Sequence, residues 1–540
     1  MQYKRRWKHK PFANARYSIM WGAQLATLAV LPAVSFAAQV VFNLDMVNVV
    51  LSPDGYPRDT VVPNGTFPGP TFKVNKGDSV VIHTHNKLTS PDMRRSTSIH
   101  WHGFFQARTS SMDGPSFVSQ CPIAPQASFD YVFDTAGQTG NYWYHSHLST
   151  QYCDGARGAF IVYDPDDPLA HLYDVDDDST IITLAEWYHV LAPAGTTSFF
   201  KTGVIPVQDS GLINGKGRFA RGPLVDYAVI TVTKGLRYRF RVISLSCRPF
   251  MTLSFDNHTF DVIELDGVEH DPVPFQRADV YAGQRLSVVL HANQSVDNYW
   301  IRAPPTGGSP NNNPNFQPNL TLAILRYVGA PEVEPKTVDV PGTKLNDSLM
   351  HPIASEGPGS LGSKPPDFAK VLKITQSPNS PFFDINGISY LSPSLPVLLQ
   401  LLSGAGKPND FLPSEQVIIL PTNSIIDITI PGNGSHPFHL HGHNFDIVQG
   451  GTDTEPNYVN PPRRDVVPIL GPGDTTFRFF SGNPGAWFLH CHIDYHLEAG
   501  LAVVFGESPP DNISGPQSQI ITPDWEQLCP NYDALDPEFQ

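Results

Sequence analysis

Charged residues and helical patterns are both scarce in this chain. Of its 540 residues only 16% are charged, and 51 acidic residues outnumber 36 basic ones, for a formal net charge of −15. Because this balance repels a polyanion, nucleic acid is excluded as a partner. No long segment repeats its apolar residues at the helical period of about 3.6, so a helical bundle is not expected.

Apolar runs of membrane length are absent beyond the N-terminus. Residues 1–37 combine a basic region, an apolar stretch from Ile19 to Val34, and small residues at Ser35 and Ala37. This order is typical of a secretory signal peptide, whereas a membrane anchor needs about 20 apolar residues. We predict cleavage after Ala37, which leaves 30 basic against 51 acidic residues and a net charge of −21. The mature protein is expected to be secreted, extracellular and free of the membrane.

Cysteine is also rare, with only five residues. Outside the cell disulfides are the default, but five cysteines leave one unpaired, and any four allow three pairings. Cys491 is the natural residue to be left over, because it lies between His490 and His492. A secreted chain with seven Asn-x-Ser/Thr sequons is expected to be a glycoprotein; they begin at Asn64, Asn257, Asn293, Asn319, Asn346, Asn433 and Asn512.

Short strand patterns take the place of helices. Residues 237–242 and 426–430 alternate polar and apolar side chains, and residues 159–163 and 501–505 are short apolar runs. With 52 prolines and 42 glycines to form turns, these segments indicate β-sandwiches. The length is enough for about three domains. Residues 164–178 and 329–366 have the composition of connections between them.

Four His-x-His pairs stand out in the first and last thirds of the chain. They are His100 with His102, His145 with His147, His439 with His441, and His490 with His492. Residues i and i+2 of a strand share one face, so each pair can direct two imidazoles at one place. Each third has two pairs, followed by a short apolar strand, which indicates that both thirds are versions of one module.

Cys491 is expected to point away from its two histidine neighbours, because strand residues alternate in direction. It can then bind a second metal together with His496 and one upstream histidine, and His436 is the obvious partner. Two histidines and a thiolate form the ligand set of blue copper. An electron-transfer copper alone would use three ligands, so the surplus of histidines indicates a multinuclear site.

Two other chemical interpretations explain less. A structural zinc site closes with four ligands and rarely spreads over two domains, and a Cys–His nucleophile leaves eight histidines unused. His83 and His85 also alternate on an expected strand but have no counterpart in the last third, so we interpret them as structural. His443 extends the run beyond His441 and is not expected to be a ligand.

The motifs resemble those of the multicopper oxidases, most closely the secreted laccases of basidiomycete fungi. They are HWHG at 100–103, HSH at 145–147, HPFHLHGH at 436–443 and HCHIDYHLEAG at 490–500. The likeness covers nearly all of the chain after Ser52. It implies an all-β fold of three cupredoxin-like Greek-key β-sandwich domains, which we place at residues 38–167, 168–341 and 342–540, with copper sites in the third domain and between the first and third.

The resemblance implies four copper ions per chain: one type 1, one type 2 and two type 3. His436, Cys491 and His496 match the type 1 ligands, and His100 and His439 match those of type 2. Six residues match the ligands of the type 3 pair: His102, His145, His147, His441, His490 and His492. The family's disulfides map to Cys121–Cys529 and Cys153–Cys247.

Further residues match positions near the copper sites. Leu501 stands where an axial type 1 ligand could be, and its lack of a donor atom should raise the reduction potential. Asp113 and Asp494 match acids that assist proton delivery. Arg248 replaces an acidic residue that contacts substrate in many relatives, and a guanidinium cannot accept a proton. We expect the substrate preference to shift toward acidic phenols or away from anilines.

The resemblance implies a monomeric laccase that oxidises phenolic substrates one electron at a time and reduces O₂ to water, with His496 receiving the electrons. Alternatives are a metal-ion oxidase, an ascorbate oxidase, or a non-enzymatic blue-copper electron carrier or copper store. The physiological substrate stays open among lignin phenols, pigment precursors and host toxins.

Overall fold

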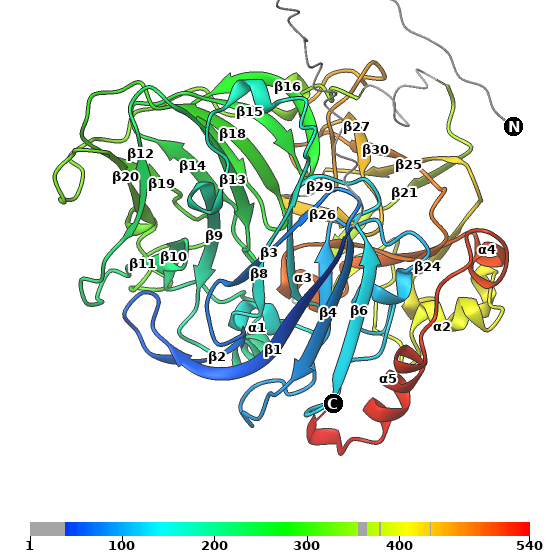
Figure 1. The fold of residues 1–540 in the computed structure, drawn as a ribbon. Helices are drawn as coiled ribbons and strands as arrows, with labels where there is room; N and C mark the ends of the chain where they lie inside the picture. Colours follow the sequence, from blue (N-terminus) through cyan, green and yellow to red (C-terminus); the bar gives the residue numbers. More distant parts are fainter. Residues whose placement is uncertain (1–37, 355–363, 377–379, 433, 540) are drawn as a thin grey trace, which may run out of the picture. The chain divides into compact units, whose positions relative to one another are not determined.

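A computed structural model describes residues 38–540, apart from 355–363, 377–379, 433 and 540. The predicted signal peptide, residues 1–37, lies outside the described residues. Strands dominate the described chain and form three β-sandwiches in succession, with short helices between and after them (Figure 1). The prediction of an all-β fold is therefore confirmed.

The first sandwich brings two His-x-His segments into neighbouring strands. One of its sheets has the order β2-β1-β4-β6: β2 (Arg58–Pro63), β1 (Gln39–Leu51), β4 (Ser79–Asn86), β6 (Ser128–Asp134). The other has the order β3-β8-β7-β5: β3 (Gly69–Asn75), β8 (Arg157–Tyr163), β7 (Gly140–Ser146), β5 (Ile99–His102). Trp101 and Trp143 are fully buried in the core of this sandwich.

The second sandwich consists of a seven-stranded and a five-stranded sheet. Its seven-stranded sheet runs β11 (Lys216–Gly217), β10 (Ser210–Ile213), β9 (Ile181–Trp187), β13 (Arg237–Ser244), β18 (Arg285–His291), β15 (Phe260–Leu265), β16 (Val268–Phe275). The five-stranded sheet runs β12 (Ala228–Val232), β20 (Leu322–Tyr327), β19 (Asn298–Arg302), β14 (Met251–Phe255), β17 (Arg277–Val280). Its core is continuous and apolar.

The third sandwich repeats the strand arrangement of the first around its histidines. One sheet runs β24 (Val417–Leu420), β32 (Ala502–Glu507), β31 (Gly485–Cys491), β26 (His436–Leu440), β29 (Val466–Ile469). The order β32-β31-β26 corresponds to β8-β7-β5, as the internal repeat predicts. The rest are β21 (Phe368–Val371), β25 (Ile425–Ile430), β30 (Thr475–Phe480), β27 (Phe445–Gln449), β28 (Arg463–Arg464), and the pair β22 (Ile374–Gln376) and β23 (Phe383–Ile385).

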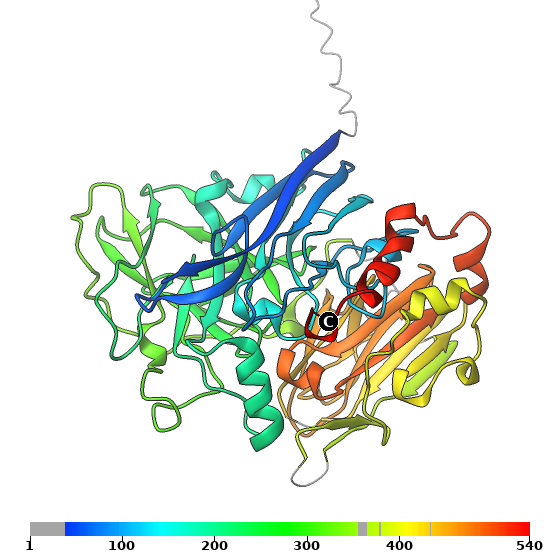
Figure 2. The same cartoon turned by 90° about the horizontal axis from the view of Figure 1, so that it is seen from below.

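Five short α-helices, which the sequence pattern does not reveal, join or cover the sandwiches: α1 (Ala192–Thr202), α2 (Val397–Leu402), α3 (Asp494–Glu498), α4 (Pro509–Ile513) and α5 (Pro523–Asp533). Side chains of α2 and α5 belong to the core of the first sandwich, and Figure 2 shows α5 in red beside it. Within the described part of the chain, no helix has the length and apolarity to span a bilayer.

The connections between sandwiches are more structured than their composition indicates. In the segment 164–178, Asp167 and Asp176 form ion pairs with Arg239 and Arg241 of β13. Residues 343–353 run beside β16 and β17 and hydrogen-bond to them. Two disulfides, Cys121–Cys529 and Cys153–Cys247, are those that the resemblance implies, and Cys491 is free and buried.

Candidate metal centres

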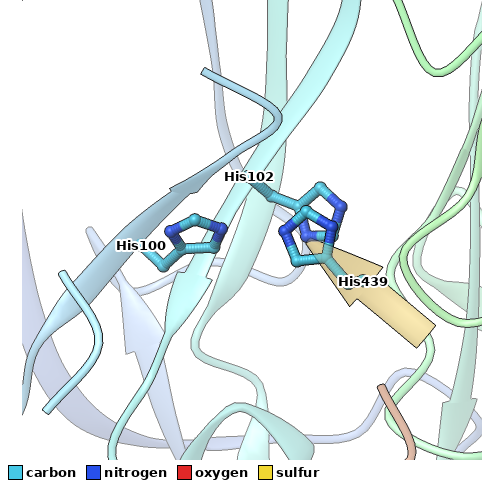
Figure 3. A group of neighbouring side chains, drawn as sticks. All are labelled: His100, His102 and His439. Carbon is cyan, nitrogen blue, oxygen red and sulfur yellow. The ribbon is translucent and has the colours of Figure 1, made fainter. Parts of the chain in front are cut away.

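The histidines of the first and third sandwiches lie at equivalent places in two strand pairs. His100 of β5 is opposite His145 of the antiparallel strand β7, and His439 of β26 is opposite His490 of β31. The four His-x-His pairs meet in one buried cluster, in which histidine rings of the first sandwich contact histidine rings of the third. The rings of His102 and His439 stack with centroids 3.7 Å apart (Figure 3).

Three sets of histidines within this cluster have the spacing of metal ligands, and the first two share His102. In each set the ligand atoms all lie within 4.8 Å of one another. The sets are His100, His102 and His439; His102, His145 and His492; and His147, His441 and His490. Figure 3 shows the first set, with two imidazoles from β5 and one from β26.

Unpartnered nitrogens indicate that these histidines bind a cation. The buried atoms without a hydrogen-bond partner include His100 Nε2, His102 Nδ1, His145 Nε2, His439 Nε2 and His492 Nε2. A buried polar atom without a partner is costly, and so many at one place require an explanation. Imidazole nitrogen is a good copper ligand, so the residues present fit the metal that the resemblance implies.

The set of His147, His441 and His490 also needs a cation, as its hydrogen bonds show. His441 Nδ1 donates to Asp113 Oδ2 at 2.8 Å, and His490 Nδ1 donates to the carbonyl oxygen of Cys491 at 3.0 Å. A neutral imidazole has one N–H, so the Nε2 atom of each carries only a lone pair. These two Nε2 atoms lie 3.1 Å apart, and His147 Nε2 lies 3.3 Å from that of His490. Lone pairs this close repel each other unless a cation lies between them.

Burial keeps the cluster neutral and therefore able to bind metal. It lowers the pKa of His490 to about 3, and the pKa values of His102, His145, His439 and His441 fall well below the usual range for the same first cause. Neighbouring histidines lower the pKa values of His102, His145, His439 and His441 further. A protonated imidazole cannot coordinate a metal, so these shifts preserve the lone pairs.

Cys491 belongs to a separate set with His436 and His496. Its Sγ lies 3.7 Å from His436 Nδ1 and 3.6 Å from His496 Nδ1, and the two nitrogens are 3.2 Å apart. Burial raises the pKa of the Cys491 thiol, so a metal is needed to stabilise the thiolate. His496, on α3, is the only partly exposed member of the set. Phe383 packs against its ring with centroids 4.7 Å apart.

Simple alternation predicts that both histidines of a pair belong to one ligand set, but in three of the four pairs they do not. Strands β7, β26 and β31 end at Ser146, Leu440 and Cys491, so the second histidine of each pair lies just beyond the strand. His145 and His147 fall into different sets, as do His490 and His492. His439 and His441 are divided in the same way, whereas His100 and His102 belong to one set.

Comparison with known proteins identifies the family. Sequence models described as multicopper oxidase match residues 45–167, 178–330 and 390–511. Laccase-1 of Agaricus bisporus is 68% identical over 499 residues, which cover 92% of this chain and 96% of the relative. The chain belongs to the multicopper oxidase family. It is therefore a copper-dependent oxidoreductase.

Further relatives agree with this assignment. The laccase of Phlebia radiata is 49% identical and covers 92% of this multicopper oxidase and 94% of the relative. The solved structure of a laccase from Botrytis aclada superposes with a TM-score of 0.82 at 31% identity and covers 93% of both chains. The structure of Fet3p, a multicopper oxidase that functions in iron import, gives a TM-score of 0.81 at 27% identity, covering 92% of this chain and 95% of that one. The expected three cupredoxin-like domains are confirmed.

The predicted acids lie in different surroundings. Asp113 is fully buried within the histidine cluster, where its backbone oxygen accepts from His100 Nδ1 at 2.7 Å. Burial raises its pKa, while His100 opposes the shift. The carboxylate of Asp494 lies 3.6 Å from Cys153 Sγ, and its pKa is raised well above the usual range by burial. Tyr152, not Asp494, contacts His492, with its hydroxyl 3.1 Å from Nδ1.

The other predicted residues surround the Cys491 set. Leu501 is fully buried, and its backbone oxygen accepts from the Cys491 amide at 3.1 Å. Arg248 follows Cys247, whose carbonyl oxygen accepts from the first amide of α3, that of Asp494. The Arg248 guanidinium makes two long hydrogen bonds, 3.3 Å to Pro206 O and 3.5 Å to Gln208 Oε1. It forms no ion pair with any residue that the structure describes.

The sequence reasoning does not reveal several residues that contact the cluster. They include Asp465, which faces His102 and His439, its partner Arg285, and Tyr152. No local motif marks them, because each lies far along the chain from the histidine it contacts. His83 and His85 instead lie on the outer face of β4, hydrogen-bonded to Asp130 and Ser128. His443 Nε2 lies 3.1 Å from Glu507 and belongs to none of the four ligand sets.

Proposed function

We propose that this multicopper oxidase is a laccase, which couples one-electron oxidation of phenolic substrates to the reduction of O₂. The observation that carries the proposal is the adjacency of two kinds of site. A Cys–His–His set with one partly exposed histidine is joined through Cys491 to His490 and His492 of a deeply buried histidine cluster. Relatives up to 68% identical over nearly the whole chain are named laccases.

The ligand sets support four copper ions. We assign the type 1 copper to His436, Cys491 and His496, and the type 2 copper to His100 and His439. One type 3 copper is assigned to His102, His145 and His492, and the other to His147, His441 and His490. Copper at these sites would supply reversible one-electron redox chemistry.

The two halves of the reaction take place at different sites, with substrate oxidation near His496 and O₂ reduction at the histidine cluster. His496 receives electrons because it is the one partly exposed ligand of its set, and the covalent path from Cys491 leads to His490 and His492. Four phenols each lose one electron, and one O₂ takes up four electrons and four protons to give two waters. Asp113, hydrogen-bonded to His441, is placed to hold a proton beside the cluster. Asp494 is proposed as a second acid farther out, on the Cys153 side.

The cellular setting is part of the same proposal. We infer a secreted, extracellular monomeric glycoprotein with residues 1–37 removed and domains at 38–167, 168–341 and 342–540. With residues 1–37 removed, 51 acidic residues against 30 basic ones make small phenols better partners than nucleic acid.

Oxygen consumption with copper analysis tests the proposal. Copper-loaded protein is given a panel of neutral phenols, ascorbate and Fe(II) while dissolved O₂ and copper per chain are measured. A laccase holds about four coppers and takes up one O₂ for every four phenols oxidised. Turnover confined to Fe(II) or ascorbate would assign the protein to another oxidase. One copper per chain without O₂ uptake would make it an electron carrier.

A further inference from the structure

The middle sandwich contacts the histidine cluster although, in the described chain, it supplies no member of the four ligand sets. The contact is the turn between β17 and β18, where Gly283 has φ +83°. A Cβ atom on Gly283 would lie 2.8 Å from His492 Cδ2 and 3.0 Å from His102 Cε1. The first contact is closer than real Cβ atoms come and the second is very tight, so the backbone of this turn forms a wall of the cluster.

Arg285, two residues after Gly283, connects all three sandwiches. Its guanidinium is fully buried and donates to both carboxylate oxygens of Asp465, from Nη1 at 2.6 Å and from Nη2 at 2.7 Å. Nε donates to the carbonyl oxygen of Asn141 at 2.9 Å. Asn141 belongs to the first sandwich, Arg285 to the second and Asp465 to the third. A bidentate pair of this kind fixes both position and plane of the carboxylate.

Asp465 in turn faces one histidine from each of the outer sandwiches. Its Oδ1 lies 3.3 Å from His102 Nε2, and its backbone oxygen accepts from His439 Nδ1 at 3.0 Å. These contacts determine which nitrogen of each ring carries the proton. His102 is left with a lone pair on Nδ1 and His439 with one on Nε2, and both of these atoms are buried without a partner.

We infer that Arg285 is a positioning residue, through which the middle sandwich sets the orientation and tautomer of His102 and His439. The inference rests on the proposed assignment of these histidines as copper ligands. A fully buried carboxylate without a counter-charge is unfavourable, so Asp465 would not keep its place without Arg285. His102 could then present an N–H where a lone pair is needed. Groups that orient ligating histidines typically change metal affinity 10- to 100-fold when altered.

Arg241 provides a matched control for the alternative that Arg285 merely holds the sandwiches together. It is also a buried arginine of the middle sandwich, bidentate to Asp176 at 2.7 and 2.6 Å. Its Nη1 donates to Asn141 Oδ1 at 2.9 Å, so it also reaches the first sandwich. Unlike Arg285, it is not hydrogen-bonded to a residue that faces a ligand histidine.

The test compares Arg285→Lys and Arg241→Lys with the wild-type holoenzyme. Lysine keeps the charge but cannot form the bidentate pair. Each protein is dialysed against graded copper, and bound copper is divided by paramagnetic resonance into type 1 and type 2 signals, with thermal melting alongside. We expect Arg285→Lys to weaken copper affinity at the cluster by about 10-fold or more, both in the type 2 signal and in the bound copper that gives neither signal, while the type 1 signal is kept. Arg241→Lys should lower the melting temperature but keep both signals.

Equal type 2 affinity in the two variants would overturn the inference and leave the proposed function intact. A wild-type protein without copper at the cluster would overturn both. If Arg285→Lys does not fold, Asp465→Asn replaces it, because the amide keeps the volume but loses the charge and one of the two guanidinium hydrogen bonds. Type 2 affinity within twofold of the wild type in Asp465→Asn would equally reject the role of the pair.

Discussion

The two nitrogens of an imidazole are not equivalent in this cluster, because the partner of one decides what the other can do. His100, His439 and His490 each donate from Nδ1 to a backbone carbonyl, which leaves Nε2 for a metal. His102 is reversed, since Asp465 lies at its Nε2. Backbone acceptors come with the fold, but the carboxylate at His102 depends on a specific residue.

Arg248 stands where the resemblance predicts an acidic residue, and substrate charge tests its effect. Replacing Arg248 by Asp should raise KM for a carboxylate-bearing phenol about fivefold, since a half-buried ion pair contributes about 1 kcal/mol. The turnover number for neutral phenols should change less than twofold. Steady-state O₂ uptake with a matched pair of phenols, one carrying a carboxylate, measures both.

Lys201 at the end of α1 controls for the overall charge of the protein. Lys201→Asp makes the same change of two charges at an exposed position. If it shifts KM for the acidic phenol as much as Arg248→Asp does, the effect is long-range attraction and not recognition. Unchanged kinetics in Arg248→Asp for phenols and anilines alike would remove any role of Arg248.

Leu501 is the second residue with a directional prediction. A thioether in its place would donate to copper from the axial side and stabilise Cu(II), so Leu501→Met should lower the type 1 reduction potential. Leu-to-Met exchange nearly conserves volume, so folding should be little affected. Redox titration of the blue absorption measures the potential. Leu420→Met, in the same core, should leave it unchanged; an equal shift in both variants would point to packing alone.

At the scale of elements, the strand pattern predicts much of the site. Alternation in β31 correctly separates Cys491 from His490, and the repeated motif predicts that two similar strand pairs meet. The division of three His-x-His pairs between two sets does not follow from alternation, because the second histidine of each of these pairs lies beyond the strand end.

Contacts between elements distant in sequence could not be predicted. Arg285 and Asp465 are 180 residues apart, and neither position differs locally from an ordinary strand end. Helices α1 and α5 are 11 residues each, too short to produce a clear period among prolines and glycines. Local sequence patterns do not predict how the middle sandwich packs against the cluster, because this packing depends on all three sandwiches at once.

Strand β16 carries a carboxyl group that should make stability depend on pH. Burial, and next the charge of Asp167, raises the pKa of Glu269 from 4.5 to about 7. The folded state therefore binds a proton that the unfolded state releases between these values, and stability should fall as pH rises from about 4.5 to 7. Glu269→Gln should melt higher than the wild type at pH 8 and equally at pH 4.

The exposed residue Asp271 of the same strand controls for removal of a negative charge. Asp271→Asn should change the melting temperature little and by a similar amount at both pH values. A Glu269→Gln variant that gains no stability at pH 8, or gains the same amount at pH 4, would contradict a raised pKa at this site.

At the scale of the whole molecule, burial divides the sequons into those that a glycan can modify and one that it cannot. The Asn512 side chain is 1% exposed, and its Nδ2, the atom that a glycan would modify, donates to Glu507 O and Ser508 O. Asn64, Asn257, Asn293, Asn319 and Asn346 are exposed. Glycopeptide mass spectrometry should find glycans among these five and none at Asn512. A glycan at Asn512 in folded protein would contradict the packing of α4.

Copper should also stabilise the assembly of the sandwiches, because each histidine set in the buried cluster takes ligands from both the first and the third. Any ligand that binds only the folded state stabilises it, by about 4 kcal/mol at a thousand times its dissociation constant. Without copper, the lone pairs of His441 and His490 face each other at 3.1 Å across buried space. Calorimetry should therefore show a melting temperature several degrees lower for the copper-free protein, restored on adding copper. Matched scans of Cys491→Ser, which removes only the type 1 thiolate, should keep most of the stabilisation. If copper-free and copper-loaded proteins melt together, the cluster does not connect the sandwiches energetically.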